Sequence, residues 1–185
     1  MELIDILDEN GNYTGKVAER SIVHKDGLWH IHVGVWIMNK KGELLFQKRS
    51  PLKEMNPNKW TRTGGHVDAG ETPIFAIQRE IQEEIGVKIP SNSLDLINID
   101  KKEVFFKNKN NYNRQFTYNY FAIVDYKIDD YKMQDDEVSD LKYITLEEMK
   151  LAKKNNDTDF TFINWDNFDE IVLMLEKKKE EYINE

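Results

Sequence analysis

The segment from Thr72 to Gly86 has the apolar spacing of a helix that buries one face. Its apolar stripe consists of Ile74, Ile77, Ile81 and Ile85. At about 100° per residue, these four side chains lie within roughly 80° of one another. Thr72 and Pro73 supply a cap residue and a proline at the first helical position, and Gly86 stands where a glycine often ends a helix. The sequence therefore predicts a helix from about Thr72 to Ile85 with its isoleucines in a core.

The same helix presents acidic residues on a second face. Glu83 and Glu84 follow Glu80 at spacings of three and four residues, so their carboxylates are neighbours on a face centred roughly 110° round from the isoleucines. Like charges at this spacing repel, and a divalent cation among them removes the repulsion. Carboxylate oxygens are the ligands that Mg²⁺ and Mn²⁺ prefer. A solvated acidic face is the alternative, because the chain has 34 acidic residues.

Residues 65–87, GHVDAGETPIFAIQREIQEEIGV, resemble the Nudix box, the signature of the Nudix hydrolases. The specified positions of the signature are all filled, by Gly65, Glu71, Arg79, Glu80, Ile81, Glu83, Glu84, Gly86 and Val87. So many matches at fixed spacing favour an enzyme site over a solvated acidic face. The resemblance implies an α/β Nudix fold, in which an α/β/α sandwich with a mixed β-sheet carries the Nudix loop–helix–loop.

The resemblance also implies a role for each part of the box. The three helical glutamates would ligate Mg²⁺, for which Mn²⁺ can substitute, and Glu83 or Glu84 would orient or deprotonate the attacking water. Arg79 and Glu71 would pair and brace the loop against the helix. The backbone of Gly64 would supply a carbonyl ligand, because a small residue permits close approach.

A second resemblance runs nearly end to end, to the type 1 isopentenyl-diphosphate isomerases and their hydrolase-like relatives, one branch of the same superfamily. It rests on the segments IDILDENGNYTG, LWHIHVGVWIMNKKGELL, KWTRTGGH and DDEVSDLKYITLEE. Three histidines and two glutamates bind a metal in that isomerase, and His24, His30 and His66 stand at the matching histidine positions. Arg49 and Lys53 match basic residues that hold the diphosphate.

Three positions depart from the isomerase pattern. Gly64 stands where the isomerase needs a cysteine, Phe116 where it has its catalytic glutamate, and Arg114 where it has a neighbouring ligand. Protonation of a C=C bond requires a positioned acid, so we expect an isomerase-like scaffold with hydrolase chemistry. Without the two glutamates, the three histidines can be metal ligands or ordinary core and rim residues, and both alternatives stay open.

Residues outside the box are candidates for the substrate side of the site. Arg49, Lys53 and Arg62 lie on strand ends and loops that flank the box, and a guanidinium can hold a phosphate through two hydrogen bonds. The alternative, a solvated surface charge, is stronger for the lysine than for the arginines. Glu137, in the acidic turn 135–137, is the candidate for a further catalytic acid. The alternative is that this turn only caps the next strand.

The rest of the chain alternates strands with turns and ends in a helix. Strands are expected at residues 2–8, 13–17, 29–38, 44–49, 93–99, 103–107, 116–126 and 140–144, with a turn at 108–113. Helices are expected from residue 145 and over 164–183. One domain is predicted over residues 1–185, with an N-terminal hairpin extension at 1–28, a Nudix core at 29–160 that holds the box at 65–87, and a C-terminal helix at 161–185.

Composition excludes several classes of function. The chain has no cysteine, which rules out a thiolate nucleophile, cysteine-ligated zinc and an iron–sulfur cluster. A net charge of −8 argues against sequence-independent nucleic-acid binding. The sequence has neither a membrane-spanning apolar run nor an export signal, which predicts a cytoplasmic protein with no membrane partner.

The expected function is hydrolysis of a diphosphate linkage in a nucleotide or nucleoside diphosphate derivative by Mg²⁺-activated water. The expected partner is this small molecule, with no nucleic acid, and a homodimer is left open. Two alternatives remain. One is an isopentenyl-diphosphate isomerase-like protein, and the other is a non-catalytic module that binds a diphosphate on the same fold.

Overall fold

The computed structural model describes residues 2–106 and 111–183. The chain divides into two compact units. The first unit comprises Met1–Val35, Gly64–Ile81 and Lys88–Phe121, and the second comprises Trp36–Thr63, Gln82–Val87 and Ala122–Glu185. Three elements begin in the first unit and end in the second: strand β3 (His30–Met38), helix α2 (Pro73–Ile85) and strand β8 (Asn111–Ile123).

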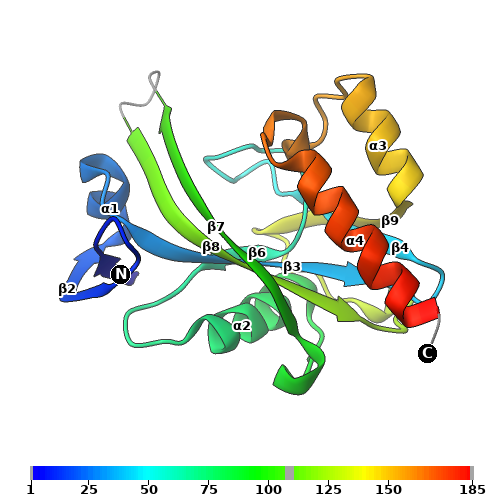
Figure 1. Ribbon diagram of the computed structural model, residues 1–185, viewed down its shortest axis with the longest axis horizontal. Helices are drawn as coiled ribbons and strands as arrows, with labels where there is room; N and C mark the ends of the chain where they lie inside the picture. The colour runs from blue at the N-terminus through cyan, green and yellow to red at the C-terminus, as the bar shows by residue number, and fades with distance from the viewer. Residues whose placement is uncertain (1, 107–110, 184–185) are drawn as a thin grey trace. The chain divides into compact units, whose positions relative to one another are not determined.

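The first unit opens with the expected hairpin, drawn in blue in Figure 1. Its elements are β1 (Leu3–Leu7), β2 (Tyr13–Glu19) and α1 (Arg20–Asp26), and the two strands pair antiparallel. Asp8 builds the turn, because its Oδ1 accepts from the backbone N–H groups of Asn10 at 2.8 Å and Asn12 at 2.9 Å. Ile4, buried on β1, and Val23, buried on α1, hold the helix against the hairpin.

The remaining strands of the first unit are the start of β3, the short β6 (Gly64–His66), and β7 (Asp95–Phe106) with β8, preceded by a 3₁₀ turn at Ser91–Ser93. β8 lies between β3 and β7, and β6 pairs antiparallel with β3. The prediction of separate strands at 93–99 and 103–107 is wrong, because β7 is one strand with an irregular register between Leu96 and Asn98. The turn predicted at 108–113 lies partly outside the described residues, and its last three residues belong to β8.

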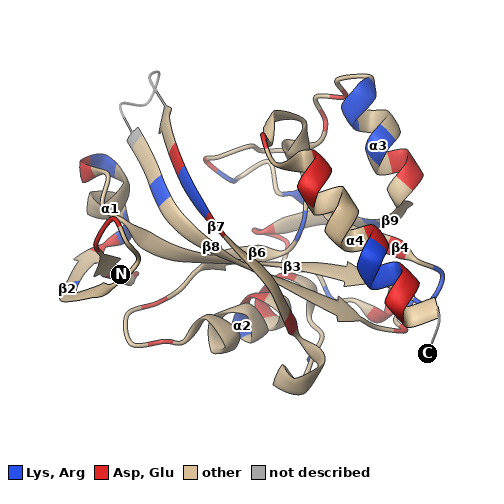
Figure 2. Cartoon of the chain, in the orientation of Figure 1, with Lys and Arg blue, Asp and Glu red and all other residues tan. Residues whose placement is uncertain are grey.

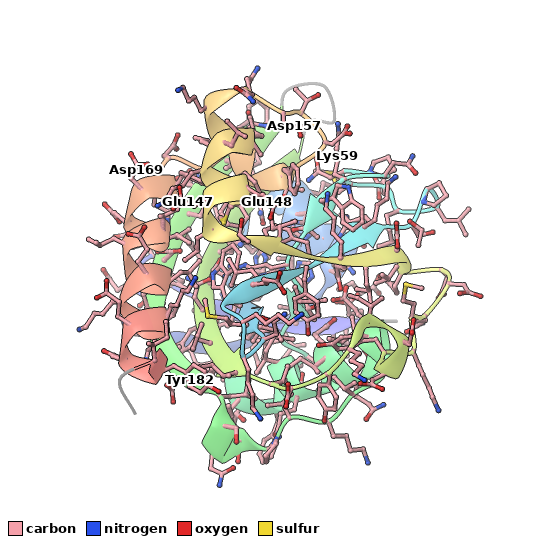
Figure 3. All side chains as sticks on the ribbon, turned by 90° about the vertical axis from the view of Figure 1, so that its right-hand side faces the viewer. Lys59, Glu147, Glu148, Asp157, Asp169 and Tyr182 are labelled. Carbon is pink, nitrogen blue, oxygen red and sulfur yellow. The ribbon has the colours of Figure 1, made fainter. Side chains whose placement is uncertain are left out.

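The second unit is built on one central strand. Its elements are β4 (Glu43–Arg49), β5 (Trp60–Thr61), β9 (Val138–Thr145), α3 (Leu146–Lys154), α4 (Phe168–Ile183) and 3₁₀ turns at Ile128–Asp130 and Thr161–Asn164. β4 pairs antiparallel with β5, with β9 and with the end of β3. Helices α3 and α4 run side by side (Figures 1 and 3), and Lys150 Nζ on α3 donates to Glu176 Oε1 on α4 at 2.6 Å.

The two helices of the second unit differ in how well their starts could be predicted. α3 begins with the expected capping box, in which Thr145 Oγ1 accepts from the N–H group of Glu148 and the glutamate carboxylate accepts from Thr145. The prediction that the last helix begins at Asn164 is wrong. A 3₁₀ turn ends at Asn164, and α4 begins at Phe168.

Aromatic rings fill the core of the second unit. Phe46 on β4 packs against Trp36 at a centroid distance of 6.0 Å and against Phe162 at 5.6 Å, and Phe162 in turn packs against Phe168 at 5.5 Å. Trp36 and Phe46 are each 1% exposed, and Phe162 is 0% exposed. This cluster fixes β4 from one side, and β4 also carries a side chain of the candidate site.

The chain therefore has an α/β architecture with a mixed multi-strand sheet, as the sequence predicts. Most pairs are antiparallel, and Trp60 and Phe160 form an isolated parallel bridge. Among residues 2–106 and 111–183, no helix has the length and apolar character needed to cross a membrane.

Candidate active site

Helix α2 carries the acidic face that the sequence predicts (Figure 2). Ile77, Ile81 and Ile85 are 0% exposed and anchor the helix, whereas Ile74 is only partly buried. The three glutamates have different surroundings. Glu83 is exposed and Glu80 is partly buried, and Glu84 is 4% exposed. A buried carboxylate is costly unless it is hydrogen-bonded or bound to a cation.

Two adjacent glycines let strand β6 of the first unit approach its neighbours closely. A Cβ atom on Gly65 would lie 2.3 Å from Cδ of Glu80, so the carboxylate lies against the backbone of β6 only because no side chain intervenes. A Cβ atom on Gly64 would lie 2.2 Å from the carbonyl oxygen of Val33 on β3. The backbone of β6 therefore lies close to β3 at Gly64 and close to a box carboxylate at Gly65.

Arg79 joins the loop to the start of the acidic face, and the predicted pair with Glu71 is present. Its Nε and Nη2 donate to the two carboxylate oxygens of Glu71 at 3.2 and 3.0 Å. Nη1 donates to Glu80 Oε1 at 2.7 Å, and Nη2 also donates to the backbone carbonyl of His66 at 3.0 Å. Burial acts to lower the pKa of Arg79, but Glu71 and Glu80 outweigh it and raise the pKa, so the guanidinium stays charged.

Glu84 is held by residues that sequence reasoning missed. Gln47 Nε2 donates to Glu84 Oε2 at 2.8 Å, and Thr63 Oγ1 donates to Gln47 Oε1 at 2.9 Å. Gln47 is 1% exposed and Thr63 is 4% exposed. The only signal in the sequence is an uncharged polar residue, Gln47, directly after the buried run Leu44–Phe46.

The C-terminal end of α2 is fixed within the second unit. Gly86 has a φ of 72°, the left-handed conformation in which glycine ends a helix. The N–H group of Lys132 donates to the carbonyl of Ile85 at 3.0 Å, and that of Gln134 donates to the carbonyl of Glu84 at 3.3 Å. Carbonyls at the helix end are thus satisfied by a separate segment.

The predicted substrate-binding cations of the second unit each contact other side chains or backbone. Arg49 Nε donates to the carbonyl of Met55 at 2.9 Å. Lys53 forms an ion pair with Glu137, so two residues predicted separately lie together. The Arg62 guanidinium lies 5.1 Å from the ring of Trp36 and 5.4 Å from that of Trp165, which are cation–π distances. The substrate-binding roles of Arg49, Lys53 and Arg62, and a catalytic role for Glu137, stay predictions.

The three predicted histidines come together in the first unit. The candidate ligand nitrogens of His24, His30 and His66 all lie within 4.8 Å of one another. His24 Nε2 lies 3.0 Å from His66 Nε2, and His30 Nδ1 lies 3.0 Å from the carbonyl of Leu28. Burial lowers the pKa of His30 to about 4, and burial with nearby positive charge lowers the pKa of His66 well below its ordinary value. Both rings are therefore neutral near pH 7.

The donor atoms of α2 suit a hard divalent cation. They are the carboxylate oxygens of Glu80, Glu83 and Glu84. Glu84 is buried, and the amide of Gln47 orients its carboxylate. Mg²⁺ and Mn²⁺ prefer such oxygen ligands, whereas imidazole nitrogens suit zinc and other transition metals. The chemistry of the two clusters therefore differs, and the α2 carboxylates fit Mg²⁺.

Comparison with known proteins places this geometry in a family. The NUDIX domain model matches residues 28–166. An uncharacterised Nudix hydrolase of Clostridium acetobutylicum is 34% identical over 152 residues, which are 80% of this chain and 72% of that protein. Nudix hydrolase 3 of Arabidopsis thaliana is 34% identical over 153 residues, and the match covers 80% of this chain but 20% of the Arabidopsis protein.

The comparisons also include isomerases and solved structures. Isopentenyl-diphosphate Delta-isomerase 2 of Photorhabdus laumondii is 28% identical over 156 residues, with 83% of each chain covered. The crystal structure of DR0079 from Deinococcus radiodurans shares the fold, with a TM-score of 0.61, 22% identity and coverage of 84% of this chain and 90% of that one. Both predicted resemblances, to Nudix hydrolases and to the isomerase branch, are confirmed. The chain belongs to the Nudix family.

Proposed function

We propose that this chain hydrolyses a diphosphate linkage in a nucleotide or nucleoside diphosphate derivative. The observation that carries the proposal is the acidic face of α2, where Glu80, Glu83 and Glu84 present carboxylates and Glu84 is buried and hydrogen-bonded. A solvated acidic face would not need a carboxylate at 4% exposure with its own amide donor.

Glu80, Glu83 and Glu84 would hold Mg²⁺, and the carbonyl of Gly64 would be a further ligand. Mg²⁺, when bound, acidifies water and neutralises charge that develops on a diphosphate. The chain's own residues then have distinct tasks. Glu83 or Glu84 orients the attacking water or takes its proton. Arg79 and Glu71 keep the loop in place beside Glu80.

The basic residues of the second unit would meet the anionic substrate. Arg49 and Lys53 carry the charge for this role, and Arg62 is the third candidate. The ion pair between Lys53 and Glu137 has to rearrange if both are to act, since a lysine that binds phosphate gives up part of its contact with the carboxylate. Glu137 would then supply a further acid from outside the box.

Three positions, Gly64, Phe116 and Arg114, support hydrolysis over isomerisation. A cysteine at Gly64 would clash with the carbonyl of Val33, so the isomerase's thiol has no room here. Phe116 packs against Trp29 at a centroid distance of 5.2 Å, and Arg114 Nε donates to Glu103 at 2.7 Å. Neither side chain is an acid able to protonate a C=C bond.

A substrate panel tests the proposal. Purified protein with Mg²⁺ is incubated with nucleoside di- and triphosphates, dinucleoside polyphosphates, ADP-ribose, thiamine diphosphate and isopentenyl diphosphate, and the products are identified. Release of phosphate or a monophosphate that stops on chelation is the expected result. Conversion of isopentenyl diphosphate to dimethylallyl diphosphate would favour the isomerase, and tight binding without turnover would favour a non-catalytic module.

We also propose that His24, His30 and His66 bind a transition metal such as Zn²⁺. Backbone carbonyls lie beside Nδ1 of His24 at 3.2 Å and of His30 at 3.0 Å, and a carbonyl partner on one nitrogen directs the other toward a metal. The ligand nitrogens already lie within 4.8 Å of one another. Neutral imidazole is the form that binds metal.

Calorimetric titration of chelator-treated protein with Zn²⁺ tests this second site. His24→Gln is expected to weaken Zn²⁺ binding at least about tenfold. His32→Gln is the matched control, because His32 stacks edge-on against His66 at 5.4 Å but lies outside the trio. Absence of Zn²⁺ binding in the wild type, or equal loss in both variants, would contradict the site.

A further inference from the structure

A buried chain of hydrogen bonds ends on a carboxylate of the Nudix box. It runs from the hydroxyl of Thr63 to the amide of Gln47 and on to Glu84, with distances of 2.9 and 2.8 Å. All three residues belong to the second unit, and each is at most 4% exposed. Solvent therefore does not compete for these bonds.

The chain has a direction that follows from the chemistry of its members. An ionised carboxylate only accepts, so the NH₂ group of Gln47 has to face Glu84, and the amide oxygen then faces Thr63. The threonine hydroxyl donates to that oxygen. If the amide turned over, two acceptors would meet at Glu84 and the hydroxyl would have to reverse its bond. Thr63 thus selects one orientation of the Gln47 amide.

Gln47 is mounted on a rigid part of the fold. Its backbone lies in β4, where it is opposite Leu141 of β9 and Thr61 of β5. Phe46, next to it, is 1% exposed in the aromatic core. A donor on a strand paired from both sides holds its target more closely than a donor on a loop.

We propose that Gln47, oriented by Thr63, is a positioning residue that fixes the Glu84 carboxylate for metal binding. The inference rests on the proposed function, in which Glu84 is a metal ligand. Partners that orient a ligand typically contribute about 10–100-fold to metal affinity or activity. Removal of the amide leaves Glu84 in place on α2 but takes away the hydrogen bond that orients its Oε2.

Gln47→Leu tests the proposal, with Gln115→Leu as its matched control. Gln115 is also buried, at 8% exposure, and its Nε2 donates to Thr117 Oγ1 at 2.6 Å, so the control removes a buried glutamine–threonine bond in the first unit. Mn²⁺ affinity is measured by calorimetry, kcat with Mg²⁺, and stability by urea unfolding. We expect Gln47→Leu to weaken Mn²⁺ binding about 10–100-fold, and Gln115→Leu to alter stability alone.

The hydroxyl is tested in the same way. Thr63→Val removes the donor and is expected to weaken Mn²⁺ binding several-fold, whereas Thr63→Ser keeps the hydroxyl and restores it. Because Thr63 acts through Gln47, adding Thr63→Val to Gln47→Leu should weaken Mn²⁺ binding no further. Thr63→Val carries the test by itself if Gln47→Leu does not fold.

Glu84→Gln distinguishes failure of the positioning role of Gln47 from failure of the proposed metal site. If Glu84→Gln loses Mn²⁺ affinity while Gln47→Leu keeps it within about twofold of the Gln115→Leu control, the positioning role is wrong and the proposed function stands. If the effects of Thr63→Val and Gln47→Leu on the logarithm of Mn²⁺ affinity are fully additive, Thr63 does not act through Gln47, and that part of the proposal is wrong. If Glu84→Gln binds Mn²⁺ as the wild type does, Glu84 is not a metal ligand. The proposed function is then wrong at this residue, and the positioning role of Gln47 is wrong with it.

Discussion

Gly64 and Gly65 are adjacent, yet an added methyl group would meet different neighbours at each. At Gly65 it would meet the end of the Glu80 side chain, with Cδ and Oε1 both at 2.3 Å. At Gly64 it would meet backbone, the carbonyl oxygen of Val33 at 2.2 Å. The end of a side chain can swing away, whereas a strand carbonyl cannot, so the two alanine variants should fail in different ways.

Gly65→Ala is expected to fold but to lose activity. The methyl group is expected to displace the carboxylate of Glu80 from β6, and displacement of a proposed ligand should weaken Mg²⁺ binding. We expect the free energy of unfolding to change by less than about 1 kcal/mol, and kcat at fixed Mg²⁺ to fall at least about tenfold. Urea unfolding and steady-state kinetics on the same preparation measure both quantities.

Gly64→Ala is the comparison for this test. Overpacking against backbone is expected to lower the free energy of unfolding by about 1–3 kcal/mol. Wild-type Mg²⁺-dependent kinetics in Gly65→Ala would show that the approach of Glu80 to β6 has no part in the site.

The glutamates of the candidate site could be predicted from the sequence, whereas the contact that holds Glu84 could not. The identities of Glu80, Glu83 and Glu84 followed from local spacing. The burial of Glu84 was not predicted, although it has a local cause, because Glu84 lies at the edge of the acidic face, only about 20° from Ile77 round the helix. The contact between Glu84 and Gln47 joins residues 37 positions apart. Such a contact depends on which strand faces the helix, which no local pattern specifies.

The start of helix α3 could be predicted from a local sequence signal, its capping box. Thr145 and Glu148 form a reciprocal capping box at its start (Figure 3 labels Glu148). Hydrogen bonds from the backbone N–H and the hydroxyl of Thr145 lower the pKa of Glu148. A carboxyl whose pKa is lower in the folded state adds stability above its unfolded pKa of about 4.3, and that stability is lost as the pH falls through the folded pKa.

Glu148→Ala is therefore expected to destabilise the protein at pH 7 by about 0.5–1 kcal/mol, with no change in kcat. The difference from the wild type should shrink as the pH is lowered below about 4. Urea unfolding at pH 7 and at pH 3.5 measures it. Glu148→Gln keeps an acceptor without the charge, so its deficit at pH 7 should be smaller than that of Glu148→Ala. This deficit should also shrink on acidification, because the wild type loses the contribution of its ionised carboxylate. A deficit in Glu148→Ala that grows on acidification would contradict this assignment.

Two predicted element boundaries, the break in β7 and the start of α4, are wrong, and tertiary contacts explain both. The polar stretch around Asp100 suggests a break in β7, but Asn98 donates to Asp100 at 2.7 Å and Asn119 of β8 donates to it at 2.8 Å, which keeps the strand paired. At the start of the last helix, Lys153 Nζ of α3 donates to the carbonyls of Ile163 at 2.5 Å and Trp165 at 3.2 Å. Those carbonyls are satisfied without a helix.

At the scale of the whole molecule, the acidic helix sits in a chain of net charge −8. A metal ion that binds the folded chain but not the unfolded chain stabilises the fold. The unfolded chain does not hold Glu80, Glu83 and Glu84 side by side, so binding there should be specific to the folded state. The carboxylates that repel one another without a cation should become a stabilising site with one.

Mg²⁺ is accordingly expected to raise the melting temperature of the wild type. A free concentration about one hundred times Kd stabilises by about 2.7 kcal/mol, and each kcal/mol raises the melting temperature by about 2–4 °C for a chain of this size. Differential scanning fluorimetry with Mg²⁺, and with matched ionic strength from NaCl, measures the shift. The double variant Glu80→Gln/Glu84→Gln should lose the shift, and an equal shift in both proteins would contradict metal binding at α2.

The proposed function requires that the carboxylates of α2 carry Mg²⁺-dependent hydrolysis. The most direct test is kcat of Glu84→Gln on a substrate identified in the panel, beside Glu147→Gln on the exposed face of α3 as a control. We expect Glu84→Gln to lower kcat at least ~100-fold with an unchanged circular dichroism spectrum, and Glu147→Gln to match the wild type. Wild-type kcat in folded Glu84→Gln would contradict it.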